Sequence, residues 1–136
     1  MEIKRINPLS LYRGVPYDYA VLAPAGGVVF TAGACPLDSD GEIVASGDLE
    51  AQTGKCLDNL EAVLTEAGSG FEQVLKTTVY VVADDRSELV RAWKVVEQRF
   101  GRARPPSTLL GLKLLGYPDQ LVEIEAIAHV PIPTIA

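Results

Sequence analysis

Two segments of the chain carry apolar residues at three- and four-residue steps, the spacing that places them on one side of a helix. The first segment follows Asp48, a suitable helix cap, and ends at Gly68, where a left-handed residue is favoured. The second follows a variant capping box, Asp85 with Glu88 three residues on, and ends at Gly101. The pattern therefore predicts two amphipathic helices. Their apolar stripes are Leu49, Thr53, Cys56, Leu57, Leu60, Val63, Leu64 and Ala67, and Leu89, Trp93, Val96 and Phe100.

The remaining apolar runs are rich in β-branched residues and bounded by turn residues, which is typical of strands. The run at 74–82 is the densest, and we expect it to be central in a sheet. Turns are predicted at 24–27, 38–41 and 116–120 from their Gly, Pro and Asp content. The predicted strands are 17–22, 28–32, 74–82, 107–115 and 121–130.

This order of elements, strands interleaved with two helices, favours an α+β fold with both helices on one face of a mixed sheet. We expect one domain over residues 1–136. The last strand alternates, so its two sets of side chains face opposite ways. The purely apolar set indicates the core, whereas the other set predicts a face that meets water, a pocket or another subunit. The sets are Val122, Ile124, Ala126, Ala128 and Val130, and Glu123, Glu125, Ile127 and His129.

Composition narrows the classes of function. The chain has 136 residues, 48% hydrophobic and 22% charged, with a net charge of −6. A negative balance disfavours nucleic-acid binding, which depends on Lys and Arg, and it disfavours an anionic membrane surface. No run approaches the ~20 apolar residues of a membrane span, and no apolar stretch follows the N-terminal charges. We therefore expect a cytoplasmic protein without nucleic-acid or membrane partners.

The chemistry-bearing residues are few. His129 is the only histidine, and nothing around it resembles a nucleophile motif, so we expect it at a surface or an interface. Cys35 and Cys56 lack the spacing of a metal or redox motif and are expected to be reduced thiols. Glu123, Glu125 and His129 spread over about 20 Å of strand, too far for a metal site, so no metal is predicted. No glycine-rich phosphate loop is present either. What remains is a strand glutamate, either solvated or salt-bridged, or able to position a water.

A series of short motifs adds to this picture. In chain order they are Pro16-Tyr17, Phe30-Thr31-Ala32-Gly33-Ala34-Cys35-Pro36-Leu37-Asp38, Gly41-Glu42-Ile43-Val44, Gly47-Asp48, Gln52-Thr53, Leu57-Asp58-Asn59-Leu60, Val74-Leu75-Lys76-Thr77-Thr78-Val79-Tyr80 and Val122-Glu123-Ile124-Glu125-Ala126-Ile127-Ala128. Together, over roughly residues 16–130, they closely resemble the reactive intermediate deaminase family (RidA/YjgF, formerly endoribonuclease L-PSP).

The resemblance implies a chorismate-mutase-like fold and a homotrimer with small-molecule clefts between subunits. Deaminases of this family hydrolyse imines and enamines to a keto acid and ammonia without a cofactor. There an arginine grips the substrate carboxylate, and a glutamate with nearby backbone groups orients the attacking water. Carried over by position, Glu123 is the catalytic carboxylate. The substrate-binding positions are Tyr17, Gly33, Cys35, Ser107 and Thr108, where Cys35 either faces the cleft or is a small buried hydrophobe.

The chain departs from this pattern where the deaminase type has its arginine. It reads Arg104-Pro105-Pro106-Ser107-Thr108, so Pro106 stands in the arginine's place and supplies neither charge nor donor. Arg104, two strand positions back and so displaced by ~7 Å, and Arg102 are the candidate replacements. The 116–119 loop is also about two residues longer than in the deaminase type.

Three functions follow from this resemblance. The first is hydrolysis of an imine, an enamine or a related C–N bond in a metabolite bound without the usual arginine. The second is a non-catalytic trimer that holds a small ligand at the clefts. The third is the ribonuclease or translation-inhibitor role of the older family name, which the net charge of −6 and the single histidine disfavour.

Overall fold

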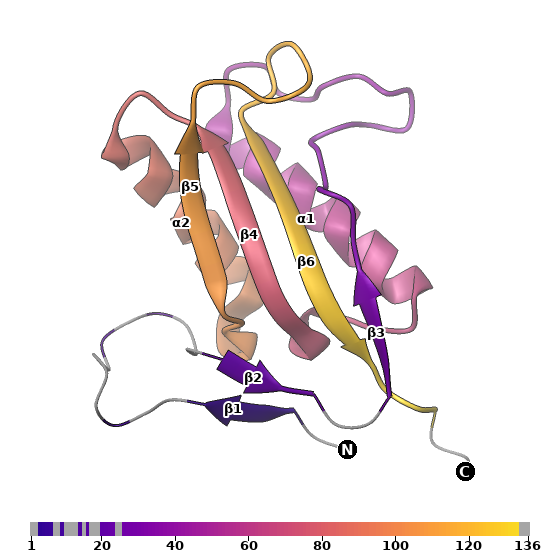
Figure 1. Cartoon of the computed structure of the whole chain (residues 1–136). Coiled ribbons are helices and arrows are strands. Elements are labelled where there is room, and N and C mark those ends of the chain that lie inside the picture. The colour runs from indigo at the N-terminus through magenta and orange to yellow at the C-terminus, as the bar shows by residue number, and fades with distance from the viewer. Residues whose placement is uncertain are drawn as a thin grey trace.

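A computed structural model describes residues 3–6, 9, 14, 16, 20–23 and 26–133 of the chain. Figure 1 shows a sheet with both helices behind it and a short two-stranded ribbon below. The elements are β1 (Lys4–Ile6), β2 (Ala20–Leu22), β3 (Gly27–Phe30), α1 (Leu49–Glu66), a 3₁₀ turn (Phe71–Gln73), β4 (Val74–Val82), α2 (Arg86–Phe100), a second 3₁₀ turn (Gly101–Ala103), β5 (Ser107–Leu112) and β6 (Val122–Val130). The predicted α+β class and both helices are confirmed.

The main sheet has the strand order β3-β6-β4-β5, so β4 is an interior strand as predicted. It runs parallel to β5 and antiparallel to β6. The turn after β5 therefore does not form a hairpin: it carries the chain past the end of β4 to the strand's other side. β5 ends at Leu112 rather than at the predicted residue 115, because its pairing partner Val82 is the last residue of β4.

The first predicted strands pair differently from one another. β2 pairs with β1, which the sequence pattern did not predict, whereas β3 pairs with β6. The two strands on either side of the predicted turn at 24–27 thus belong to separate sheets. The segment after β3 continues along β6, with the Thr31 amide bonded to the Ala126 carbonyl and Ala34 bridging Ile124.

The helices cover one face of the sheet and leave the other open, and we call the second the open face. The caps are as predicted: Asp48 accepts a hydrogen bond from the Ala51 amide at 3.0 Å, and Asp85 accepts one from the Ser87 amide at 2.9 Å. Among the described residues, no helix is both long and apolar enough to cross a bilayer. The side chains between helices and sheet that are fully buried include Leu57, Leu60, Leu64, Val74, Val79, Val81, Val96, Val122 and Ile124.

The alternation predicted for β6 is observed with two exceptions. Glu123 and Glu125 are half-buried on the open face, as expected, but Val130 is half-buried rather than part of the core. The prediction of a surface or interface His129 is wrong: its side chain is 1% exposed within this single chain. The backbone of Gly26 packs so closely against the imidazole that a Cβ there would come within 2.7 Å of the ring. Gly26, just before β3, thus covers the ring.

Candidate functional site

The candidate site begins at a bulge in the segment that follows β3 and still pairs with β6. The Thr31 amide donates to the Ala126 carbonyl at 2.9 Å, and the Thr31 hydroxyl accepts from the Ala126 amide at 3.0 Å. Pairing resumes where Ala34 bridges Ile124. Three residue steps from Thr31 to Ala34 therefore lie opposite two steps from Ala126 to Ile124, which is the count of a β-bulge. A bulge re-aims side chains locally, and here it brings residue 33 over β6.

Gly33, at the centre of this bulge, lies against the Glu123 side chain. A Cβ on Gly33 would meet the Glu123 carboxylate at 2.2 Å from Oε2 and 2.6 Å from Cδ. No real Cβ approaches so closely, so the carboxylate occupies the space that any other residue at 33 would fill. Two predicted site residues far apart in sequence are thus in direct contact.

Two further side chains hold the other oxygen of the same carboxylate. The Cys35 thiol donates to Glu123 Oε1 at 3.2 Å, and the buried Gln120 amide donates to it at 3.3 Å. Burial raises the pKa of the Cys35 thiol to about 11, and the hydrogen bond and negative charge of Glu123 act in the same direction. We call Gly33, Cys35, Gln120 and Glu123 the carboxylate cluster.

The loops around the cluster are fixed by amides from the buried side of the fold. Asn59 of α1 donates to the carbonyls of Cys35 and Leu37, both at 2.9 Å. Gln52 of α1, fully buried, donates to the Asp119 carbonyl at 2.9 Å and accepts from the Leu121 amide at 2.8 Å. The long loop before β6 is therefore anchored on a helix.

The amide side chains of Gln52, Asn59 and Gln120 were not predicted to serve the site. Gln52 and Asn59 lie in motifs that carry the family resemblance, and Gln52 falls on the helical stripe between Leu49 and Cys56. A polar residue on a buried helical stripe is a signal that it has a specific partner. Gln120 had no such signal, because it precedes the alternating strand.

The predicted substrate-binding residues at the start of β5 lie in a different part of the molecule. Ser107 contacts Thr77 through their hydroxyls on the helix side of the sheet, whereas Thr108, the next residue, faces the open side. Arg104 adopts a left-handed conformation with φ 43°. With Ser107 and Trp93 it lines a small pocket beside α2. Strand alternation does not extend back to Arg104, because β5 begins only at Ser107, so the predicted placement of Arg104 two strand positions before position 106 is wrong.

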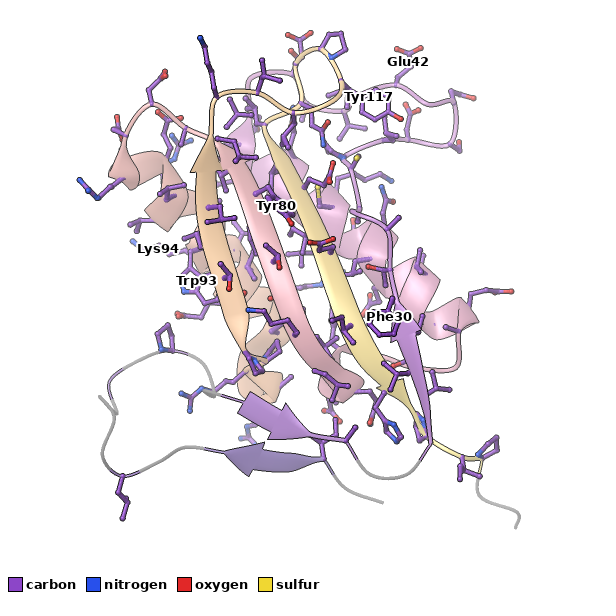
Figure 2. All side chains as sticks on the ribbon, viewed as in Figure 1. Phe30, Glu42, Tyr80, Trp93, Lys94 and Tyr117 are labelled. Carbon is purple, nitrogen blue, oxygen red and sulfur yellow. The ribbon has the colours of Figure 1, made fainter. Side chains whose placement is uncertain are left out.

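A lysine stands beside position 106 on the open face. The Thr77 amide donates to the Pro106 carbonyl at 2.9 Å, so Lys76 is level with Pro106 across the β4–β5 pair. Lys76 Nζ donates to the Thr108 hydroxyl at 2.6 Å. It also lines a pocket of about 170 Å³ together with Phe30, Thr31, Thr78, Glu125, Ala126 and Ile127. Figure 2 shows Phe30 and Tyr80 on this face of the sheet, and the Tyr80 hydroxyl donates to Glu125.

The carboxylate cluster and position 106 are well separated within one chain. Glu123 is level with Tyr80 on β4, and Tyr80 is level with Leu110 on β5, four residues beyond Pro106. Four strand steps of ~3.3 Å and two strand spacings of ~4.8 Å place Glu123 about 16 Å from position 106. A small metabolite therefore cannot contact both in one chain. Tyr17, the remaining predicted site residue, lies outside the described residues.

Comparisons with known proteins agree with this fold and with the motifs. A RutC family protein from Pyrococcus horikoshii is 37% identical over 115 residues, covering 84% of this chain and 86% of the relative. The 3-aminoacrylate deaminase RutC of Acinetobacter baylyi is 30% identical over 125 residues, covering 90% of this chain and 97% of that protein.

A solved structure is similar over nearly the whole chain. The crystal structure of YyfB from Yersinia pestis, a Rid family protein of unknown function, matches with a TM-score of 0.83 and 31% identity, covering 95% of this chain and 99% of that one. The family model described as endoribonuclease L-PSP matches residues 10–130. The chain therefore belongs to the endoribonuclease L-PSP family, the RidA/YjgF group of proteins.

Proposed function

We propose that this protein is a hydrolase that converts an imine or enamine into the corresponding carbonyl compound and ammonia. The observation that carries the proposal is the Glu123 carboxylate, held through Oε1 by Cys35 and Gln120, with Oε2 against Gly33. A carboxylate fixed at one oxygen keeps the other in a defined direction for a water molecule. The deaminase RutC, a relative over most of the chain, supports the reaction class.

The proposed reaction needs only water and a group that accepts its proton. Glu123 takes a proton from water as the oxygen attacks the imine carbon, and the C=N π electrons move to nitrogen. Glu123 returns that proton to the nitrogen, which gives the carbinolamine. The carbinolamine hydroxyl then loses its proton to Glu123 as its C=O bond forms, and the nitrogen takes this proton and leaves as ammonia when the C–N bond breaks. An enamine enters the same sequence after protonation at carbon gives the imine. No cofactor takes part in these steps.

The substrate class follows from the start of β5. Pro106 offers no charge where the family resemblance implies an arginine, and Arg104 lies toward α2. We infer that the substrate either has no carboxylate next to the imine or is held by a weaker cation, for which Lys76 is suitably placed beside Thr108. A lysine provides a point charge and not the bidentate grip of an arginine.

The site is proposed to lie between copies of the chain in a homotrimer. The separation of about 16 Å between Glu123 and position 106 supports this, because one small ligand reaches both only if they come from different subunits. Val28 and Phe30 on β3 and Leu110 on β5, which are 44%, 73% and 41% exposed, add apolar surface for such contacts.

Imine hydrolysis in vitro tests the proposal. An amino-acid oxidase generates 2-iminobutanoate and 2-iminopropanoate in situ, semicarbazide traps the remaining imine, and an imine without a carboxylate is assayed in parallel. We expect the wild type to hydrolyse the carboxylate-free imine, and Glu123→Ala to lose at least about 10²-fold in kcat. Glu66→Gln, a change at an exposed carboxylate at the end of α1, is the control and should retain activity.

Two results would contradict the proposed hydrolase. Wild-type protein that binds these compounds without turnover would favour the non-catalytic ligand-binding trimer. Equal activity in wild type and Glu123→Ala would remove Glu123 from the mechanism.

A further inference from the structure

The two oxygens of the Glu123 carboxylate have different surroundings. Oε1 is the acceptor for both the Cys35 thiol at 3.2 Å and the Gln120 amide at 3.3 Å. Oε2 is the atom that lies over Gly33. The donors thus converge on one oxygen and leave the second directed at the bulge.

The thiol in this arrangement is a donor and not a nucleophile. With a pKa of about 11, roughly one thiol in 10⁴ is ionised at pH 7, so nearly every Cys35 carries the proton that Glu123 accepts. A cysteine used for covalent attack has the opposite surroundings, with positive charges nearby that lower its pKa. Cys35 instead adjoins a carboxylate, which opposes thiolate formation.

The position of the thiol is set by the fold. Its backbone carbonyl accepts from Asn59 of α1 at 2.9 Å, and the preceding residue, Ala34, bridges Ile124 of β6. The backbone at Cys35 is therefore held by two elements, α1 and β6. Cys56, the other cysteine, is fully buried in the core and donates to the Val122 carbonyl at 3.5 Å.

We propose that Cys35 is a positioning residue: its S–H, with the Gln120 amide, clamps Glu123 Oε1 and thereby orients Oε2 toward the attacking water. The inference rests on the proposed hydrolase. The role differs from both earlier expectations for Cys35, which were direct contact with substrate in the cleft and burial as a small hydrophobe. The predicted grouping of Cys35 with substrate-binding residues then changes to support of the carboxylate.

The first test needs no substrate. In a Cys56→Ala background, where Cys35 is the only thiol, iodoacetamide alkylation at pH 8 is followed by mass spectrometry. We expect Glu123→Gln to raise the alkylation rate about tenfold. The substitution removes the negative charge and the hydrogen bond to a carboxylate, both of which oppose ionisation of the thiol. Glu125→Gln is the control and should leave the rate unchanged. Equal rates with and without the Glu123→Gln substitution would overturn the coupling between thiol and carboxylate.

The second test examines the carboxylate itself. Crystal structures of Cys35→Ala and Cys35→Ser are compared with the wild type. We expect the Glu123 carboxylate to leave its place over Gly33 in Cys35→Ala and to keep it in Cys35→Ser, whose hydroxyl still donates. An unmoved carboxylate in Cys35→Ala would overturn the proposal whether or not the protein hydrolyses imines.

Kinetics then separate positioning from substrate binding. On an imine that the wild type hydrolyses, Cys35→Ala should lower kcat about tenfold at constant KM, and Cys35→Ser should restore it to within about twofold. Cys56→Ala is the control for loss of a thiol. A change in KM alone would overturn the positioning role and return Cys35 to the substrate-binding residues. A silent wild type would instead count against the proposed hydrolase and leave the first two tests to decide the role of Cys35.

Discussion

The two ends of the open face differ in how tightly they are built. At the start of β6, three segments converge on one carboxylate: the segment with Gly33 and Cys35 that follows β3, the loop ending at Gln120, and β6 itself. At the start of β5, on the open face, the side-chain hydrogen bond among the described residues is the one from Lys76 to Thr108. Position 106, beside this pair, holds a buried proline.

If the proposed function holds, different segments of the chain specify the activation of water and the recognition of substrate. A substitution in the carboxylate cluster disturbs several contacts at once, since Glu123 touches three other side chains or backbones there. A substitution at the start of β5 lies about 16 Å from Glu123 of the same chain, and in the proposed hydrolase it changes substrate recognition without removing any contact within the carboxylate cluster. The following predictions test that independence.

Gly33→Ala should have the largest effect. The new Cβ would lie 2.2 Å from Glu123 Oε2, so the carboxylate must leave, and imine hydrolysis should fall about 10²-fold or more. Gly54→Ala in α1 is the matched control, because nothing lies within 4 Å of its Cβ. That control should stabilise the protein by up to about 1 kcal/mol through helix propensity. Steady-state kinetics and thermal unfolding measure both, and undiminished activity in Gly33→Ala would contradict the packing described.

Pro106→Arg should sharpen the comparison from the other end. A guanidinium there adds charge-assisted hydrogen bonds to a carboxylated imine, which we expect to raise kcat/KM for 2-iminobutanoate about 10- to 100-fold. Pro106→Leu, which removes the ring without adding charge, is the control. The rate on a carboxylate-free imine should not rise. If Pro106→Arg and Pro106→Leu behaved alike, recognition would depend on another group.

Gln120→Met tests how much the hydrogen bonds of Gln120 stabilise the fold. The side chain, 4% exposed, bonds the Tyr117 amide at 3.1 Å, the Val122 carbonyl at 3.1 Å and Glu123. Leaving these groups without their partner should lower the free energy of unfolding by about 1–3 kcal/mol, measured by urea denaturation. Glu61→Ala, an exposed residue of α1 in a surface ion pair, should change it by less than about 0.5 kcal/mol. Comparable losses in the two variants would contradict the tight packing of this end.

The smallest expected effect is a pH dependence of stability. The folded state raises the pKa of Cys35 from 9.0 to about 11, so it binds the thiol proton more tightly than the unfolded chain does. The contribution of this protonated thiol to the free energy of unfolding is complete below pH 9 and is lost as the pH rises toward 11. The urea midpoint of wild type should therefore fall more steeply over that range than the midpoint of Cys35→Ser. Parallel curves would show that the thiol is not held as described.

The elements of the fold were predictable where a single periodicity ran without interruption. The stripes and caps indicated α1 and α2, and the dense run at 74–82 indicated β4 with the bounds that the structure has. The short pairing of β1 with β2 has too few residues for such a signal. The alternation of β6 directs His129 toward the open face, yet Gly26 covers its ring and the side chain is buried. The pattern of β6 alone could not predict this burial, because Gly26 is distant from His129 in sequence.

The candidate site was predictable in its residue types more than in its contacts. Glu123, Gly33 and Cys35 were singled out from the sequence, but their contact depends on a bulge that no local pattern announces. The placement of Arg104 two strand positions before position 106 was wrongly predicted, because its backbone is left-handed and β5 begins only at Ser107. The roles assigned to Ser107 and Thr108 stay predictions, and the structure places these two residues on opposite faces of the sheet.

The bulge between Thr31 and Ala34 also constrains the length of this segment. Deleting one residue there would let the strand pair with β6 without interruption, which by itself is favourable. Two steps would then lie opposite two, so Thr31 would stay level with Ala126 and Ala34 with Ile124. The one residue left between them would lie opposite Glu125, and the close contact of Gly33 with the Glu123 carboxylate would be lost. The number of residues in this segment is therefore as important as their identity, and a homologue with a gap here should be expected to have lost the glycine–carboxylate contact.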